Sequence, residues 1–291
     1  MFWTRGLLEV KLNKLAQVIA GCWAEAETRL TELIAEKHPN PSEELITDLL
    51  AGELRASVAR ASDSHRVEHA FLEDIDSQIP NLNISDARRF GGLIASVTPH
   101  TKPHESQVSA ADLGIVILRP QVWLNGWGNE TIECSRDHAT GLLAQAKVGQ
   151  HKKRSEGYSW NSLKKKQEDL FPKRHAYYSL LLYRLKGNKL NEFQPLRWQL
   201  CRDHTVDEVK KWFNSGLFPE EQPSSTLLKH LFDGKIGTMD PNIIQTVIAP
   251  TKGNFRVIEI RVFWPDGSGP PPSLHHQQEQ HQEANIQRLY Q

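Results

Sequence analysis

Three polar residues lie at the ends of two apolar segments in the middle of the chain. Asp112 precedes the segment LGIVIL, and Gln145 and Lys147 lie at the end of the segment GLLAQAK. Because side chains alternate along a β-strand, Gln145 and Lys147 are expected to lie on the same face. If the two segments pair, a carboxylate, an amide oxygen and an ammonium group can meet at one edge of a sheet.

Such a group of side chains suits the chemistry of a metal ion and a phosphate. Carboxylate and amide oxygens are ligands that Mg²⁺ accepts, together with water and phosphate oxygens. The ammonium group of Lys147 could orient an attacking water or stabilise charge that develops on a phosphate. The alternative is a buried ion pair between Asp112 and Lys147 that has no chemical role.

A strongly basic stretch begins at Lys147. From position 147 to position 174 the sequence has nine Lys or Arg residues, opposed by Glu156, Glu168 and Asp169 alone. This pattern fits a surface that contacts nucleic-acid phosphates, and it also fits a basic face that contacts only solvent. The formal net charge of the whole chain is zero, whereas nucleic-acid-binding proteins are often basic overall.

The residues before Asp112 are predicted to be mainly helical. Apolar residues recur at three- and four-residue spacing over 7–37, and a second helix follows Ser42, whose hydroxyl can cap it. A third helix is predicted over 65–78. The segment 91–100 is ambiguous between strand and helix.

From about position 109 the sequence has the pattern of strands. Segments rich in Val, Ile, Leu and Tyr predict strands, and amphipathic segments with polar caps predict helices. Predicted strands cover 109–118, 141–148, 176–185 and 255–264, and predicted helices cover 159–171 and 205–216. This order of elements predicts a layered α/β or α+β fold.

The composition is that of an ordinary globular protein, with 38% hydrophobic and 24% charged residues in 291 positions. No segment approaches the ~18 consecutive apolar residues of a membrane span, and the charged N-terminus does not resemble a secretory signal. Three widely spaced cysteines predict a reducing compartment, so we expect a cytoplasmic protein without membrane attachment. The Pro-, Gln- and His-rich segment 266–291 predicts a flexible tail.

The segments AADLGIVI and LLAQAK resemble the core signature of the PD-(D/E)xK nuclease superfamily. The resemblance covers about half the chain, from Glu43 to Arg184. It implies a restriction-endonuclease-like α/β fold, in which a mixed sheet is flanked by helices in the order helix, three strands, helix, strand. The implied core covers 41–185, after an N-terminal helical segment at 1–40 and before an α+β portion at 186–265 that packs on the core.

The resemblance also implies roles for individual residues. Asp112, Gln145 and Lys147 correspond to the motif aspartate, the second acidic position and the motif lysine. A glutamate from the preceding helix would complete the site. Glu43 and Glu44 are both candidates, and Glu44 is preferred. These acidic residues and Gln145 would bind Mg²⁺ or Mn²⁺, and Lys147 would position the attacking water.

The helix predicted over 159–171 resembles the glutamine-bearing helix that several branches of the superfamily place against DNA. Gln167 would be that glutamine, and basic residues around it would contact phosphates. The expected DNA-binding residues are Lys152, Lys153, Arg154, Lys164, Lys165, Lys166 and Gln167.

The resemblance implies a Mg²⁺-dependent deoxyribonuclease that hydrolyses phosphodiester bonds, in prokaryotic restriction or antiviral defence. Gln145 departs from the family pattern, because a neutral amide binds Mg²⁺ more weakly than the usual carboxylate. The alternative is a catalytically silent DNA-binding or scaffold subunit, with a partner subunit or a second copy of the chain. A third hypothesis is a different hydrolase that uses His100 or His104, close to Asp112 in the sequence.

Overall fold

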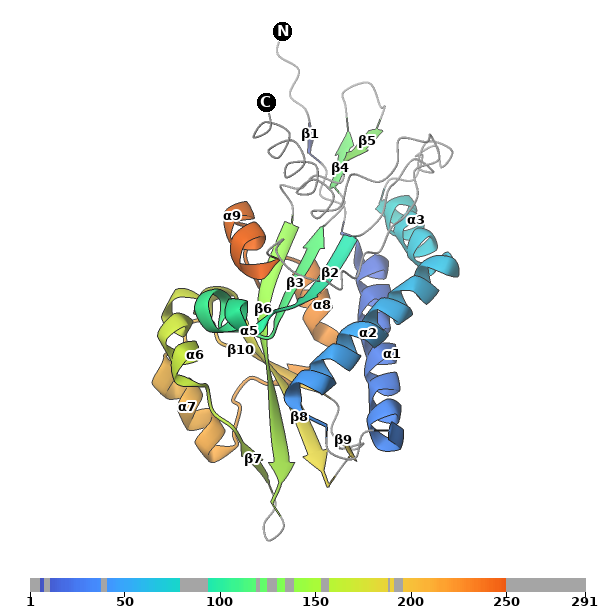
Figure 1. The fold of residues 1–291 in the computed structure, drawn as a ribbon. Coiled ribbons are helices and arrows are strands. Elements are labelled where there is room, and N and C mark those ends of the chain that lie inside the picture. Colours follow the sequence, from blue (N-terminus) through green and yellow to red (C-terminus); the bar gives the residue numbers. More distant parts are fainter. Residues whose placement is uncertain are drawn as a thin grey trace, which may run out of the picture.

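A large mixed β-sheet forms the centre of the molecule in the computed structural model (Figure 1). The structure describes residues 6–7, 11–37, 41–78, 94–118, 121–124, 130–133, 139–152, 157–187, 189–190 and 196–249. Within them the main strand order is β11-β10-β8-β6-β3-β2, with β7 beside β6 and β9 beside β8. The strands are β2 (Ile94–Pro99), β3 (Leu113–Leu118), β6 (Ala139–His151), β7 (Tyr158–Trp160), β8 (Tyr178–Lys186), β9 (Lys189–Leu190), β10 (Arg197–Leu200) and β11 (Gln222–Pro223).

Strand β6 lies in the middle of this sheet. It pairs in parallel with β8 on one side and antiparallel with β3 on the other. In the β3–β6 pair, Leu113 lies opposite Ala144. Asp112 immediately precedes β3, so the same register places it opposite Gln145. Because a slip of one residue would turn every side chain to the other face, this register positions the site.

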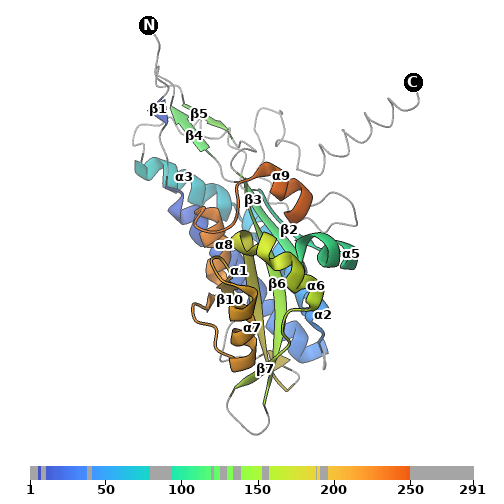
Figure 2. The same ribbon diagram turned by 90° about the vertical axis from the view of Figure 1, so that its left-hand side faces the viewer.

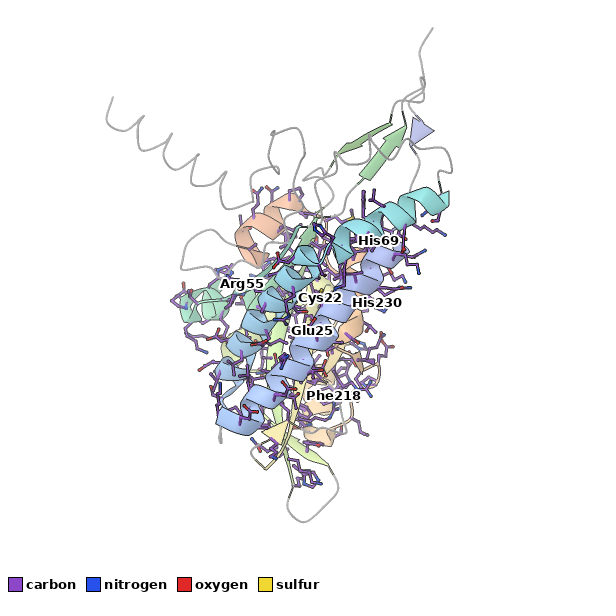
Figure 3. The ribbon with its side chains drawn as sticks, turned by 90° about the vertical axis from the view of Figure 1, so that its right-hand side faces the viewer. Cys22, Glu25, Arg55, His69, Phe218 and His230 are labelled. Atoms are coloured by element: carbon purple, nitrogen blue, oxygen red, sulfur yellow. The ribbon has the colours of Figure 1, made fainter. Side chains whose placement is uncertain are left out.

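One face of the sheet is covered by long helices (Figure 2). They are α1 (Asn13–Lys37), α2 (Glu43–Asp63), α3 (Arg66–Gln78) and α8 (Ser225–Phe232). Buried residues recur along α1 at three- and four-residue spacing, as a helix with one apolar face requires. Cys22 and Glu25 of α1 lie beside α2 (Figure 3), and the Glu25 carboxylate accepts hydrogen bonds from Ser57 and Arg60 at 2.9 and 2.8 Å.

The other face carries mostly short helices, which enclose a second apolar core. They are α5 (Lys102–His104), η1 (Glu105–Ser109), α6 (Lys165–Leu170), η3 (Phe171–Lys173), η4 (His175–Tyr177), α7 (Val206–Ser215), α9 (Pro241–Ile243) and η5 (Ile244–Ile248). In the views of Figures 1 and 2, the start of α2, α5 and α6 lie around the middle of β6. This is where the polar side chains meet.

A second, smaller sheet combines two strands from the connection between β3 and β6 with one strand from near the N-terminus. It consists of β1 (Gly6–Leu7), β4 (Gln121–Leu124) and β5 (Glu130–Glu133), in the order β1-β4-β5. None of these three strands pairs with the large sheet within the described residues. The chain between the two halves of the site therefore contributes β4 and β5 to this second sheet.

The structure confirms an α/β fold with a mixed sheet flanked by helices. Residues after 186 extend this sheet, because β10 pairs with β8. The helix predicted over 159–171 is wrong in its first half: β7 covers Tyr158–Trp160, and α6 begins only at Lys165. Trp160 packs against Gly149 in the β6–β7 pair, a long-range contact that overrides the local pattern.

The other elements expected from the sequence either correspond to helices and strands of the structure or lie outside the described residues. The helix expected over 7–37 begins at Asn13, and the ambiguous segment 91–100 contains strand β2. The strand expected over 255–264 and the tail expected over 266–291 lie outside the described residues. None of the helices in the described part of the chain is long and apolar enough to span a lipid bilayer.

Candidate active site

Asp112 and Gln145 are in direct contact at the start of β3. One carboxylate oxygen of Asp112, Oδ2, accepts a hydrogen bond of 2.8 Å from the backbone N–H of Ala146. The same oxygen accepts a second hydrogen bond from the side-chain amide of Gln145. Gln145 has no exposed surface, so its amide must find all its partners within the protein.

Glu43 and Lys147 complete one side of this group. Lys147 follows Gln145 on the same face of β6 and is only 2% exposed. Its ammonium nitrogen lies 3.6 Å from Oε1 of Glu43, the first residue of α2. Nε2 of Gln145 lies 3.4 Å from the same oxygen of Glu43. The ion pair formed by Lys147 is therefore with Glu43, whereas the alternative considered from the sequence was an ion pair with Asp112.

Glu105 and Gln167 extend the hydrogen-bonded group on the other side. The side-chain nitrogen of Gln167 donates to Oε1 of Gln145 at 2.8 Å and to Oε1 of Glu105 at 3.0 Å. The side-chain oxygen of Gln167 accepts a hydrogen bond of 2.8 Å from the backbone N–H of Lys164. The result is one connected series of polar contacts from Glu105 through Gln167 and Gln145 to Asp112.

Negative charge predominates in this group and changes the acidity of Asp112. Burial, and then the nearby charges of Glu43 and Glu105, raise the pKa of Asp112 to about 7. The positive charge of Lys147 and the hydrogen bond from Ala146 act in the opposite direction. The carboxylates of Asp112, Glu43 and Glu105 are opposed by the ammonium groups of Lys147 and Lys102, and a bound cation would relieve the remaining negative charge.

The structure brings Glu43, rather than the preferred Glu44, into the site. Glu44 lies one residue further along α2 and forms an ion pair with Lys102. The side chain of Glu44 is 62% exposed, and the charge and hydrogen bond of Lys102 lower its pKa. Adjacent residues on a helix point in different directions, and here only the Glu43 side chain points towards β6.

Gln145 also differs from its expected orientation. We expected its side-chain oxygen to face a metal, but its nitrogen faces Asp112 and Glu43. Two carboxylates attract an N–H donor, and the oxygen of Gln145 accepts the hydrogen bond from Gln167. For Gln145 to present its side-chain oxygen to a metal, its amide group must therefore rotate so that the oxygen and the nitrogen exchange places.

The expected DNA-binding residues do not lie together. Gln167 is 2% exposed, and its side-chain amide bonds to Gln145 and Glu105 rather than extending into solvent. Lys164, Lys165 and Lys166 lie at the start of α6, whereas Lys152 follows the end of β6, at the other end of the β6–β7 hairpin (Figure 1). The expected residues Lys153 and Arg154 lie outside the described residues.

Both histidines of the third hypothesis contact backbone atoms of the C-terminal helices. Nε2 of His100 lies 2.9 Å from the carbonyl oxygen of Ile248, and Nε2 of His104 lies 2.8 Å from that of Val247. Burial lowers the pKa of His100 to about 4. These contacts hold η5 against β3, which is a structural role. We therefore do not assign acid–base chemistry to either histidine.

Glu105 is the site residue that sequence reasoning missed. Glu105 lies at the start of η1 and is largely buried. The residues around it in the sequence predict neither a strand nor a long helix. Its position seven residues before Asp112 is the one signal that the sequence offers. The conformation that turns Glu105 towards Gln167 is a π-helical turn, a type often found at functional sites.

Comparison of the chain with protein-family models, with curated proteins and with solved structures finds no match.

Proposed function

We propose that the protein is a divalent-metal-dependent nuclease that hydrolyses phosphodiester bonds in DNA. The observation that carries the proposal is the meeting of Asp112, Gln145, Lys147 and Glu43 at one point of the sheet. The order α2, β2-β3-β6, α6, β8 supports a restriction-endonuclease-like core, since it reproduces the expected helix, three strands, helix and strand.

The residues of the site fit a hard divalent cation. Asp112 and Glu43 both contact the Gln145 amide, and burial together with the nearby charges of Glu43 and Glu105 raises the pKa of Asp112. The described residues contain no group of three or more His, Cys, Asp or Glu side chains that could hold a metal together. We propose Asp112, Glu43 and, once its amide has turned over, the Gln145 oxygen as ligands of Mg²⁺, an ion that usually keeps several water or phosphate ligands.

Each protein group would have a separate part in the hydrolysis. A bound divalent cation would supply positive charge to the phosphate and lower the pKa of a bound water. Lys147, held by Glu43, would place its ammonium group near the attacking water or the charge that develops on the phosphate. Gln167 holds the Gln145 oxygen through their 2.8 Å hydrogen bond, so this bond would have to break when the amide turns its oxygen towards a metal.

The test is DNA cleavage with Mg²⁺ and with Mn²⁺, on supercoiled and linear substrates. We expect wild type to cut, and Asp112→Asn and Lys147→Met to lose at least about 100-fold in rate, as is usual when a charged catalytic group is removed. Lys229→Met is the control, because Lys229 pairs with Asp233 on the opposite face of the sheet. The nuclease proposal is lost if wild type does not cut under any of these conditions.

A catalytically silent DNA-binding subunit is the second candidate. The observation that favours it is the orientation of Gln145, whose N–H groups already satisfy Asp112 and Glu43 without a cation. Such a protein would bind DNA as tightly after Asp112→Asn as before and would show no stabilisation by Mg²⁺. Thermal unfolding with EDTA and with Mg²⁺ separates the two candidates without an activity assay.

A further inference from the structure

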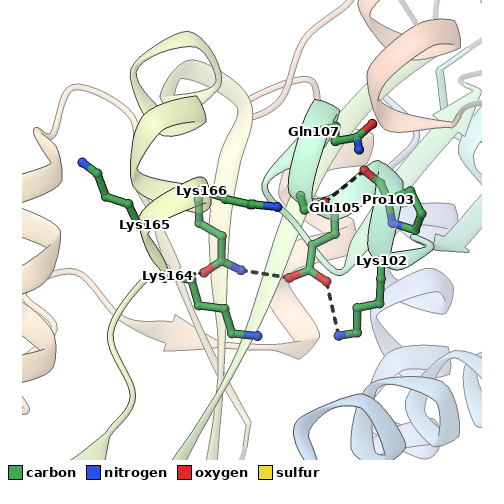
Figure 4. A pocket seen from close by; sticks show the side chains of 9 residues that line it. Lys102, Pro103, Glu105, Gln107, Lys164, Lys165 and Lys166 are labelled. Atoms are coloured by element: carbon green, nitrogen blue, oxygen red, sulfur yellow. Dashed lines mark hydrogen bonds and ion pairs between the residues drawn. The ribbon is translucent and has the colours of Figure 1, made fainter.

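A groove lined by lysines lies next to the proposed active site. It has a volume of about 450 Å³ and separates α5 and η1 from the start of α6 (Figure 4). Lys102, Lys164 and Lys166 line it, with Glu105 and Gln167 between them. Glu105 and Gln167 also belong to the series of contacts that reaches Asp112. A ligand in the groove would therefore lie beside the site.

The lysines of the groove differ in how far their charges are balanced. Lys102 forms ion pairs with Glu44 and, at 3.3 Å, with Glu105. Lys165 pairs with Asp169 at 3.1 Å, and its ammonium group points away from Glu105 in Figure 4. Lys164 and Lys166 have no ion-pair partner among the residues that the structure describes. The unbalanced positive charge of the groove thus comes from Lys164 and Lys166.

The size and charge of the groove indicate the class of its ligand. Its volume is within the range of about 300–1,000 Å³ that is typical of sites for small molecules and is large enough for one nucleotide unit. Two free ammonium groups opposite a third suit the oxygens of a phosphate group, because lysines bind phosphate as point charges. Glu105 makes the groove less favourable for an anion, because its carboxylate repels negative charge and forms an ion pair with Lys102.

We infer that this groove binds one phosphate group of the DNA strand and so positions the strand relative to Asp112. The inference rests on the proposed function and adds to it a second phosphate subsite, built from Lys164 and Lys166 on one side and Lys102 on the other. The phosphate displaces part of the interaction between Lys102 and Glu105. It belongs either to an internal phosphodiester or to the phosphorylated end of a strand.

The first test measures binding of a fluorescent single-stranded oligonucleotide in EDTA at several salt concentrations. Each lost phosphate contact lowers the slope of log Kd against log salt by about 0.7. Because the two lysines are proposed to share one phosphate, we expect Lys164→Ala/Lys166→Ala to lower the slope by about 0.7. The control Lys229→Ala/Lys235→Ala removes the same charge near Asp233, on the other face of the sheet, and should leave the slope unchanged. An equal decrease of this slope in both double variants would overturn the inference.

Glu105→Gln gives a second test with an effect of opposite sign. Removing the negative charge of Glu105 releases Lys102 from its ion pair and removes the repulsion between Glu105 and the phosphate. DNA should therefore bind severalfold more tightly in EDTA. Weaker binding by Glu105→Gln would count against the groove as a phosphate subsite.

The source of the phosphate is identified with three oligonucleotides that carry a 5′-phosphate, a 3′-phosphate or neither. If a terminal phosphate occupies the groove, one phosphorylated oligonucleotide binds wild type more tightly, and Lys164→Ala/Lys166→Ala abolishes that advantage. If an internal phosphate occupies it, the variant loses affinity equally for all three. Unchanged affinity for all three oligonucleotides would overturn the inference. Because these measurements use EDTA, their outcome does not depend on whether wild type cuts DNA.

Discussion

The side-chain amide of Gln145 donates a hydrogen bond to Asp112 across the β3–β6 pair. The register of this pair places the two residues opposite each other, and Glu43 contacts the same amide from α2. A neutral N–H group thus lies between two carboxylates. Any cation that binds here must compete with this hydrogen bond, so the stability of the site depends on both pH and metal concentration.

Replacement of Asp112 by asparagine should remove a pH dependence of stability. The pKa of Asp112 is about 7 in the folded protein, whereas an aspartate in the unfolded chain has a pKa near 4, so between these values the folded state holds more protons. The free energy of unfolding therefore falls as pH rises from about 4 to about 7, by at most about 1.4 kcal/mol per pH unit.

Urea unfolding in EDTA at pH 5, 6, 7 and 8 checks this prediction. Asp112→Asn should show a flatter profile and should be more stable than wild type at pH 8, because the amide carries no charge to bury. An equal pH dependence in the variant and in wild type would show that Asp112 is not the titrating group.

Replacement of Gln145 by glutamate should make stability depend more strongly on Mg²⁺. The new carboxylate faces Asp112 and Glu43, so repulsion lowers the melting temperature in EDTA. Mg²⁺ at millimolar concentration should restore much of this loss and raise the melting temperature more than it does for wild type.

Gln199→Glu is the matched control for this prediction. Gln199 is also a fully buried glutamine of the sheet, but it lies on β10 and bonds to the backbone of Leu200 and Glu220. The control should be destabilised without any recovery in Mg²⁺. Similar recovery in the two variants would exclude a specific cation site at Gln145.

Replacement of Lys147 by methionine should move the titration of Asp112 to higher pH. The charge of Lys147 lowers the pKa of Asp112, so its loss raises that pKa further. The decline in stability should then extend above pH 7 in EDTA. Lys210→Met is the control, since Lys210 pairs with Glu168 at 2.8 Å on α6. A pH profile that is identical to wild type would show that Lys147 does not act on Asp112.

Replacement of Gly114 by alanine should disrupt the contact between β3 and η5. A Cβ atom at this position would lie 1.6 Å from the carbonyl oxygen of Ile248 and 2.9 Å from Nε2 of His100. Forced separation of these segments should cost about 3 kcal/mol or more in the free energy of unfolding.

Gly52→Ala gives the comparison for Gly114→Ala. Gly52 lies in α2 with no heavy atom within 4 Å of the added Cβ, so the substitution should stabilise the protein by about 0.5–1 kcal/mol. Urea unfolding of Gly114→Ala and Gly52→Ala measures the change in the free energy of unfolding for each variant. A Gly114→Ala protein as stable as wild type would contradict the close packing of η5 on β3.

The sequence predicts the parts of the site that depend on strand periodicity. Gln145 and Lys147 lie on one face of β6 because side chains alternate, and Asp112 lies opposite Gln145 because β3 pairs antiparallel with the first part of β6. These inferences need only local patterns and one pairing. The α/β class follows from the same patterns.

The sequence does not predict contacts that depend on how helices are placed against the sheet. The choice between Glu43 and Glu44 depends on the rotation of α2 about its axis, which packing against α1 and β6 determines. Glu105 reaches the site through a π-helical turn that no simple pattern signals. Gln167 turns inward because Gln145 and Glu105 both accept hydrogen bonds from it.

The central position of β6 also determines how fast different parts of the site exchange hydrogen with the solvent. Because β6 is bonded to β3 on one side and β8 on the other, the amide hydrogens around Gln145 and Lys147 become accessible only when the sheet separates. The groove is built on helices of three to six residues, which can open without disturbing those strands. Local opening of these helices can thus expose the groove while the amide hydrogens of β6 around Gln145 and Lys147 stay protected.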